Sequence, residues 1–141
     1  MGYEPIDVAG DAGIRATGKS LGEAFREAVL GMYSLVTDLG KVEEKTSIKV
    51  DEEHETLEGL LVDLLNDLIY RMDVDGFMGK SVHVDEFVTE GEIKKIEITV
   101  KGEEFDPGRH PGGLLLKAAT YHNLKVEKRN GEWSMEVIFD I

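Results

Sequence analysis

Carboxylates gather at two places in the sequence, near its start and at its last two residues. Asp7 and Asp11 lie four residues apart in a glycine-rich turn that runs to Gly13, and Asp140 is followed by the free carboxylate of Ile141. Oxygen ligands of this kind are what calcium, magnesium and manganese ions prefer. If the final strand lies beside the first, Asp11, Asp140 and the Ile141 carboxylate would converge on one divalent cation. The alternative for Asp7 and Asp11 is a solvated turn, in which Asp and Gly are common residues.

A second pattern overlaps the end of this turn. Residues Gly13 to Ser20 read Gly-Ile-Arg-Ala-Thr-Gly-Lys-Ser and satisfy the phosphate-binding pattern G-x-x-x-x-G-K-[ST]. In such a loop Lys19 would reach the outer phosphates and Ser20 would hold magnesium. The context argues against it, because residues 6–12 are too polar for the buried strand that precedes such a loop, and residues 14–17 themselves favour a strand. We interpret the match as coincidental and keep a small P-loop nucleotide-binding protein as an alternative.

No arrangement of nucleophile and base typical of an enzyme is visible in the sequence. Four histidines are present, none with the spacing of a metal site, and each is interpreted as a satisfied surface or loop residue: His54, His83, His110 and His122. The segment Glu103–Asp106 is interpreted as a solvated strand end, and Lys117 as a helical lysine whose charge reaches solvent. The residues alone therefore indicate a small acidic α+β domain with a candidate oxygen-ligand metal site.

The composition narrows the class of protein further. The 141 residues carry 29 Asp and Glu against 16 Lys and Arg, a net charge of −13, and include no cysteine. The lack of cysteine excludes disulfides, thiol chemistry and cysteine-ligated metals, and the negative charge disfavours direct binding of RNA or DNA. No apolar run is long enough to cross a membrane, and the N-terminus does not read as a secretory signal. We expect a cytoplasmic protein that forms a single domain over residues 1–141.

Two helices are predicted from capping residues and apolar periodicity. Ser20, followed three residues later by Glu23, predicts a capping box and a helix that reaches about Asp38. Apolar residues over Leu57–Met72 recur at helical spacing and form one continuous stripe. The polar residues that lie off this stripe are Glu58, Asp63, Asn66 and Asp67.

The other segments predict strands and one further helix. A strand is predicted over residues 42–50, and alternating apolar residues predict a hairpin around residues 82–84 and 96–100. Asn130-Gly131 is a strong hairpin signal between strands at 124–128 and 133–141, and Leu114–Asn123 reads as a short third helix. The order β-α-β-α-β-β-α-β-β favours an α+β domain with a mixed sheet and about three helices.

Several segments, in order and over essentially the whole chain, resemble the archease family. The matching segments are Asp7–Ile14, Ser20–Phe25, the Leu57–Ile69 helix, Gly102–Asp106, Lys117–His122 and Val137–Ile141. The K-A-x-T-Y-H pattern at Lys117–His122, together with the closing D-I, is the specific part of this resemblance.

The resemblance implies a partner protein of the RtcB-type RNA-splicing ligase, which joins RNA ends with GTP and manganese. Archeases are described as accelerating guanylylation of this ligase and restoring it for further turnovers, which implies an activator of tRNA splicing rather than a ligase. The family's metal-binding aspartate falls on Asp11, its penultimate aspartate on Asp140, and the lysine of its K-A-x-T-Y motif on Lys117. The family's H-T-A before the first aspartate reads Val8-Ala9-Gly10 here, so any role of that histidine and hydroxyl is missing.

Another class of function remains open beside the activator and the P-loop protein. A chaperone-like or tRNA-methyltransferase-modulating binding module would bind unfolded or RNA-modifying proteins with little dependence on Asp11 or Asp140. Stable binding of ATP or GTP that is lost in Lys19→Ala would instead favour the P-loop reading.

Overall fold

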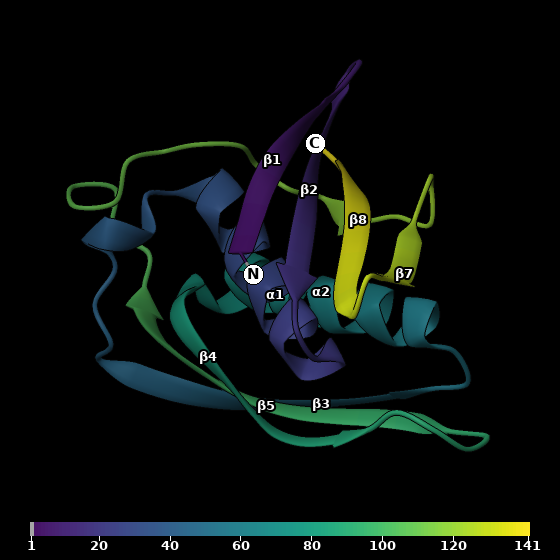
Figure 1. The fold of residues 1–141 in the computed structure, drawn as a ribbon. Coiled ribbons are helices and arrows are strands. Elements are labelled where there is room, and N and C mark those ends of the chain that lie inside the picture. The colour runs from purple at the N-terminus through teal and green to yellow at the C-terminus, as the bar shows by residue number, and fades with distance from the viewer. Residues whose placement is uncertain (1) are drawn as a thin grey trace.

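The computed structural model describes residues 2–141 and contains two β-sheets and two long helices (Figure 1). One sheet has the order β1 (Gly2–Val8), β2 (Asp11–Gly18), β8 (Glu132–Asp140) and β6 (Ala118–Ala119), and β7 (Lys125–Arg129) also pairs with β8. The other has the order β3 (Thr46–His54), β5 (Lys94–Glu104) and β4 (Phe77–Val88). All strand pairs among the described residues are antiparallel. The α+β class is confirmed, whereas the single mixed sheet is corrected to two antiparallel sheets, because every connection between paired strands reverses the chain direction.

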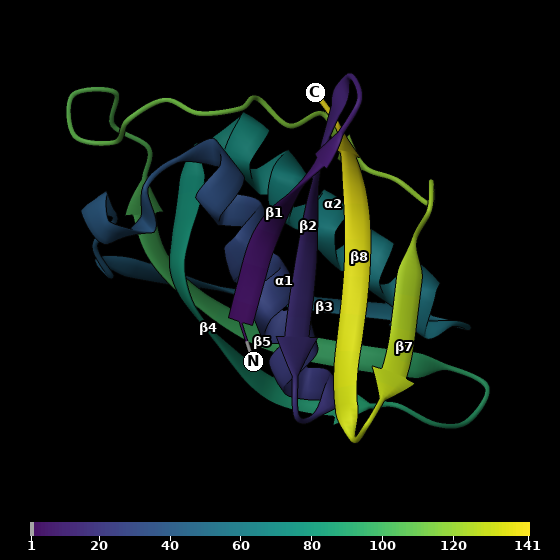
Figure 2. The same cartoon turned by 45° about the horizontal axis from the view of Figure 1, so that its top comes forward.

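The helices α1 (Leu21–Val36) and α2 (Leu57–Asp75) each contact strands of both sheets, and η1 (Leu39–Lys41) is a single 3₁₀ turn (Figure 2). The capping box is confirmed: the Ser20 hydroxyl accepts the N–H of Glu23 at 3.1 Å, and the Glu23 carboxylate accepts the N–H of Lys19 at 2.8 Å. Within residues 2–141, no helix is long and apolar enough to span a membrane.

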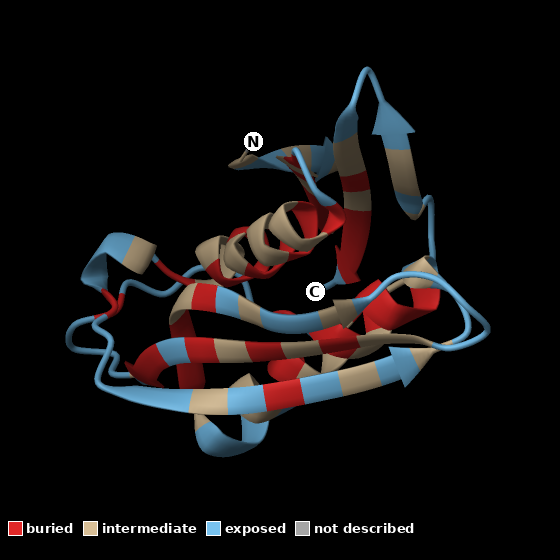
Figure 3. Cartoon of the chain, turned by 60° about the horizontal axis from the view of Figure 1, so that its bottom comes forward, coloured by how far each residue is buried: buried red, intermediate tan, exposed pale blue. Residues whose placement is uncertain are grey.

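The core lies where the helices meet the inner faces of the sheets (Figure 3). The predicted apolar stripe of α2 is confirmed, since five of its leucines are fully buried: Leu60, Leu61, Leu64, Leu65 and Leu68. In β8, alternate residues contribute to the same core through Met135, Val137 and Phe139. The final strand is therefore fixed with one face inward, and Asp140 follows on the opposite face.

The third helix predicted over Leu114–Asn123 is wrong. Residues 112–117 have no regular secondary structure, and β6 and a turn follow them. Their backbone N–H groups donate to distant elements instead of to the preceding helical turn: Leu114 to the carbonyl of Leu35 at 2.9 Å and Lys117 to that of Asp140 at 2.8 Å. These tertiary bonds outweigh the helical propensity of a short leucine-rich segment.

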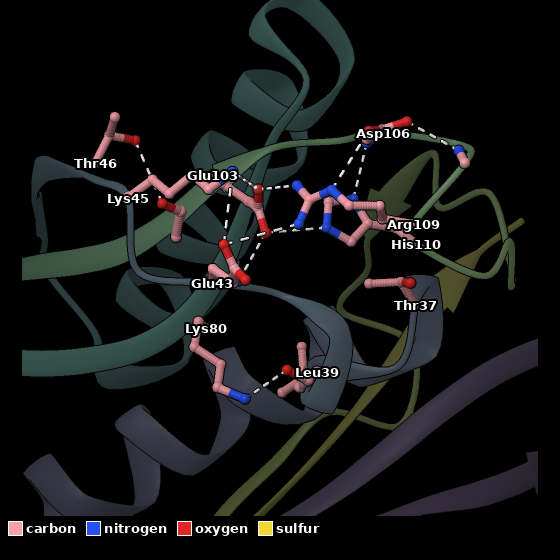
Figure 4. Close-up of polar contacts among 12 residues, drawn as sticks. Thr37, Leu39, Glu43, Lys45, Thr46, Lys80, Glu103, Asp106, Arg109 and His110 are labelled. Atoms are coloured by element: carbon pink, nitrogen blue, oxygen red, sulfur yellow. Dashed lines mark hydrogen bonds and ion pairs between the residues drawn. The ribbon is translucent and has the colours of Figure 1, made fainter.

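A buried carboxylate anchors the connection that leads from β5 to β6. Glu103 is 3% exposed, and it accepts hydrogen bonds from the Arg109 guanidinium, from the N–H of Glu43 at 2.7 Å and from His110 Nε2 at 3.1 Å (Figure 4). His110 Nδ1 accepts the N–H of Asp106 at 2.8 Å, so the ring proton lies on Nε2. His110 is thus a satisfied loop histidine, and it is buried.

The interpretation of Glu103–Asp106 as a solvated strand end is wrong at Glu103. The pairing of β5 with β4 shifts register between Gly79 and Ser81, opposite this part of β5. Gly102 and Glu103 are buried in succession, which breaks the alternation that the apolar residues of β5 establish.

Removal of the Glu103 charge should change the acid stability of the protein. The hydrogen bond from Arg109, followed by those from the N–H of Glu43 and from His110, lowers the pKa of Glu103 from 4.5 to about 2. A carboxyl pKa that is lowered in the folded state stabilises the fold above the unfolded value, and this contribution is lost as the pH falls through the folded value. We expect Glu103→Gln to lower the Tm at pH 7 and to flatten the decline in stability between pH 4.5 and pH 2.

Thermal denaturation monitored by circular dichroism across this pH range provides the measurement. The adjacent Glu104, which is exposed, supplies a matched control, because Glu104→Gln should leave both the Tm and its pH profile unchanged. A Glu103→Gln protein with the wild-type profile would contradict the anchoring role.

The hydroxyl of Tyr33 provides a second test of the core. The side chain is 0% exposed, and its hydroxyl has no hydrogen-bond partner within residues 2–141. A buried hydroxyl without a partner destabilises the fold by about 1–3 kcal/mol. We expect Tyr33→Phe to raise the free energy of unfolding by about 1 kcal/mol, measured by urea denaturation. Tyr121→Phe, at an exposed tyrosine, is the control and should leave the free energy of unfolding unchanged. Destabilisation by Tyr33→Phe but not by Tyr121→Phe would show that the Tyr33 hydroxyl has a hydrogen-bond partner.

Candidate functional site

The pairing of β2 with β8 places Asp11 and Asp140 at the same end of the larger sheet. Ala12 pairs with Phe139, so the next positions in the register are Asp11 and Asp140, one at the start of β2 and the other at the end of β8. Both residues lie on the face opposite the core, because Phe139 points inward and side chains alternate along a strand. The expected adjacency of the two aspartates is therefore present in the backbone, and the C-terminus lies beside the β1–β2 turn (Figures 1 and 2).

Lys117 and Ile141 complete this end of the sheet. Lys117 is exposed and immediately precedes β6, and its N–H donates to the carbonyl of Asp140 at 2.8 Å. Ile141 follows Asp140 and is 42% exposed. The four predicted residues thus come from three segments that are far apart in the sequence: the start of β2, the residue before β6 and the end of β8. We call them the strand-end site, defined as Asp11, Lys117, Asp140 and Ile141.

Asn66, which lies off the apolar stripe of α2, positions the segment that carries Lys117. Its side-chain amide donates to the carbonyl of Ala119 at 3.2 Å and accepts the N–H of Ala119 at 2.7 Å. Asn66 therefore pairs with one residue of β6 as a neighbouring strand would, and it fixes the segment that carries Lys117. In the sequence Asn66 is not distinguished from Asp63 and Asp67, which also lie among the leucines of α2, so no local signal predicts this contact.

The donors of the strand-end site suit a hard divalent cation. Within residues 2–141, the carboxylates of Asp11 and Asp140 take part in no hydrogen bond or ion pair, so both are available as oxygen ligands. No group of three acidic or histidine side chains in the same range is close enough to form a metal site by itself. A cation held here would need further ligands, and the terminal carboxylate and water are chemically suitable.

The P-loop alternative is contradicted by the structure. The four residues between Gly13 and Gly18, which a phosphate-binding loop needs as a loop, lie within β2. Arg15 in this strand forms ion pairs with Glu4 at 2.9 Å and with Glu136 at 3.4 Å. Since the N–H groups of a strand are paired with its neighbours, they cannot surround a phosphate.

Comparison with known proteins identifies the family. The model of the archease protein family matches residues 3–141. A Methanopyrus kandleri protein named protein archease is 34% identical over 141 residues, which cover 100% of both chains. A solved Methanobacterium thermoautotrophicum protein is 28% identical, with a TM-score of 0.83 and coverage of 99% of each chain. An archease from Thermotoga maritima, described as a possible chaperone, shares the fold with a TM-score of 0.53, 21% identity and coverage of 98% of this chain and 96% of its own. The chain therefore belongs to the archease family.

Proposed function

We propose that this archease is a non-enzymatic activator of the RtcB-type RNA-splicing ligase in the cytoplasm. In this role it promotes GTP-dependent guanylylation of the ligase and its repeated turnover in tRNA splicing. The observation that carries the proposal is the strand-end site, where three positions match the family's motifs. Asp11 lies at the start of β2, Lys117 immediately before β6 and Asp140 at the end of β8, and β8 pairs with both other strands. A shared fold alone would not require these chemical groups to lie close together.

The strand-end site contains charged groups of both signs. Asp11, Asp140 and the Ile141 carboxylate would hold a divalent cation such as calcium, magnesium or manganese, which provides positive charge toward phosphate oxygens. Lys117 is exposed, its N–H is bonded to the carbonyl of Asp140, and its side chain would offer a second positive charge to the nucleotide or to the partner. Because β2, β8 and β6 hold these residues, the groups are positioned before the partner arrives.

The overall charge supports a protein partner rather than direct contact with RNA. The net charge of −13 repels a polyanion but attracts a basic, RNA-binding protein. Association with such a ligase should therefore weaken as the salt concentration rises.

A chaperone-like role is the second candidate function. It rests on the Thermotoga maritima archease, which is described as a possible chaperone and shares the fold of this chain. A chaperone-like activity would act on unrelated unfolded proteins and would not depend on the strand-end site. Protection of a denatured protein from aggregation that is equal in the wild type and in Asp140→Ala would support it.

The activator proposal is tested by single-turnover guanylylation of the cognate ligase with labelled GTP and manganese. We expect the wild-type protein to accelerate guanylylation, and we expect Asp140→Ala to reduce the acceleration by about tenfold or more, equivalent to about 1.4 kcal/mol. The reason is that Asp140 contributes an oxygen ligand and no contact with the core, since it is exposed.

The matched control is Glu132→Ala, which removes an exposed carboxylate at the opposite end of the same strand. It should leave the acceleration unchanged, and thermal denaturation should show that both variants fold. Full activation by a folded Asp140→Ala protein would overturn the role of the strand-end site. No acceleration by the wild type, with an otherwise active ligase, would overturn the activator function itself.

A further inference from the structure

An apolar cavity opens on a part of the surface that the proposed function does not use. Its volume is about 320 Å³, and it lies between the second half of α2 and the segment 112–116. We call it the α2 groove, defined by six apolar residues that line it: Ile69, Met72, Met78, Phe105, Leu114 and Leu115. This volume is at the small end of the range for binding pockets, about 300–1,000 Å³, and it fits one or two large apolar side chains.

The outer wall of the α2 groove is held open rather than folded over the cavity. The N–H groups of Gly113 and Leu114 donate to the carbonyls of Val36 and Leu35, both at 2.9 Å. A side chain at Gly113 would come within 2.5 Å of the Leu35 carbonyl oxygen, so glycine permits this close approach. Leu115, in the same wall, is 79% exposed. The wall therefore presents a large apolar side chain to water at the mouth of a preformed apolar cavity.

The charges around the groove determine what kind of partner fits it. Asp73 lines the groove, Asp75 lies in the last turn of α2, and Glu104 packs beside Gly76, which caps the helix. The last turn of α2 contains no basic residue, although the C-terminal end of a helix favours positive charge. Within residues 2–141, no hydrogen bond or ion pair engages the carboxylates of Asp73, Asp75 or Glu104. A positive charge supplied from outside would compensate them.

The lining of the groove favours a protein segment over a small molecule. Asp73 is its one charged side chain, and the remaining lining residues are apolar or glycine. Small-molecule pockets normally add several precisely placed polar groups that orient the ligand, and these are missing here. An amphipathic helix needs only an apolar groove for its anchors and opposite charge at the rim.

We propose that the α2 groove binds a basic amphipathic segment of a partner protein, with large apolar side chains in the cavity and Lys or Arg against the acidic rim. Leu115, at the mouth of the cavity, contacts the apolar anchors of the bound segment. The proposal is independent of the ligase, because it rests on the groove alone and is tested without any ligase.

The probe is a synthetic peptide of leucine and lysine, with its leucines at helical spacing, and the comparison is the same peptide with glutamate in place of lysine. Binding to the full-length protein is measured by fluorescence anisotropy and mapped by NMR chemical shifts. We expect the lysine peptide to bind, the glutamate peptide not to bind, and the largest shifts at Ile69, Met72 and Leu114. Leu115→Ser and the double variant Asp73→Asn/Asp75→Asn should each weaken binding by about tenfold.

The turn between β4 and β5 supplies matched controls at the end of β4 opposite the groove. Ile93 is 49% exposed, and Glu90 and Glu92 are exposed carboxylates without partners within residues 2–141. Ile93→Ser and Glu90→Gln/Glu92→Gln should bind the lysine peptide as the wild type does. Equal losses in the control and groove variants, or full binding by Leu115→Ser, would show attraction by net charge alone and overturn the proposal. A dimer in solution that dissociates in Leu115→Ser would assign the groove to a second copy of the chain and also overturn it.

Discussion

The hydrogen bonding of β8 along both of its edges is the constraint on which the rest of the molecule depends. One edge pairs with β2, and the other pairs first with β7 and then with β6. The strand carries Met135, Val137 and Phe139 into the core on one face, so its register cannot shift by one residue without exposing all three. The same register places Asp140 next to Asp11. The position of the strand-end site is therefore a consequence of core packing.

The exposed carboxylates and the buried polar side chains have different roles in this protein. Most of the 29 acidic residues lie on the surface, where they set the long-range field that partners meet. Glu103 and Asn66 act instead inside the protein, where each satisfies groups of a segment that has little regular structure. The connection from β5 to β6 is thus held by a buried charge at its beginning and by a side-chain amide at its end. Between these two anchors lie both the wall of the α2 groove and Lys117.

Local signals allowed a large part of the fold to be predicted. The capping box at Ser20, the leucine stripe of α2 and the Asn130-Gly131 turn all depend on residues within a few positions of each other. Asn130 and Gly131 indeed adopt positive φ values of 52° and 78°, as a tight hairpin requires. The third helix failed because the leucines at 114–116 looked helical locally, whereas their backbone is bonded to α1 and β8.

The candidate site could be predicted only as residue types and by its resemblance to a family. Asp11 and Asp140 were recognisable as carboxylates near chain ends, but their adjacency depends on which strand β8 joins, and strand order is a tertiary property. The burial of Glu103 likewise depends on the N–H of Glu43, more than fifty residues away, and on a register shift in the pairing of β5 with β4. The contact of Asn66 with Ala119 also joins residues more than fifty positions apart. No periodicity in the sequence reports such contacts.

The place of β8 in the sheet order also determines when the protein can fold during its synthesis. Arg15 of β2 and Glu136 of β8 form an ion pair across 121 positions of sequence, so β2 leaves the ribosome long before its neighbour exists. At about 5–20 residues per second, synthesis of the segment between β2 and β8 takes about 6–23 s, during which one edge of the β1–β2 hairpin is unpaired. The three-stranded sheet and both helices are complete in sequence by Glu104 and can begin to assemble in that interval. The larger sheet can instead form only after β8 (Glu132–Asp140) has been translated, because β8 joins β2 to β6 and β7.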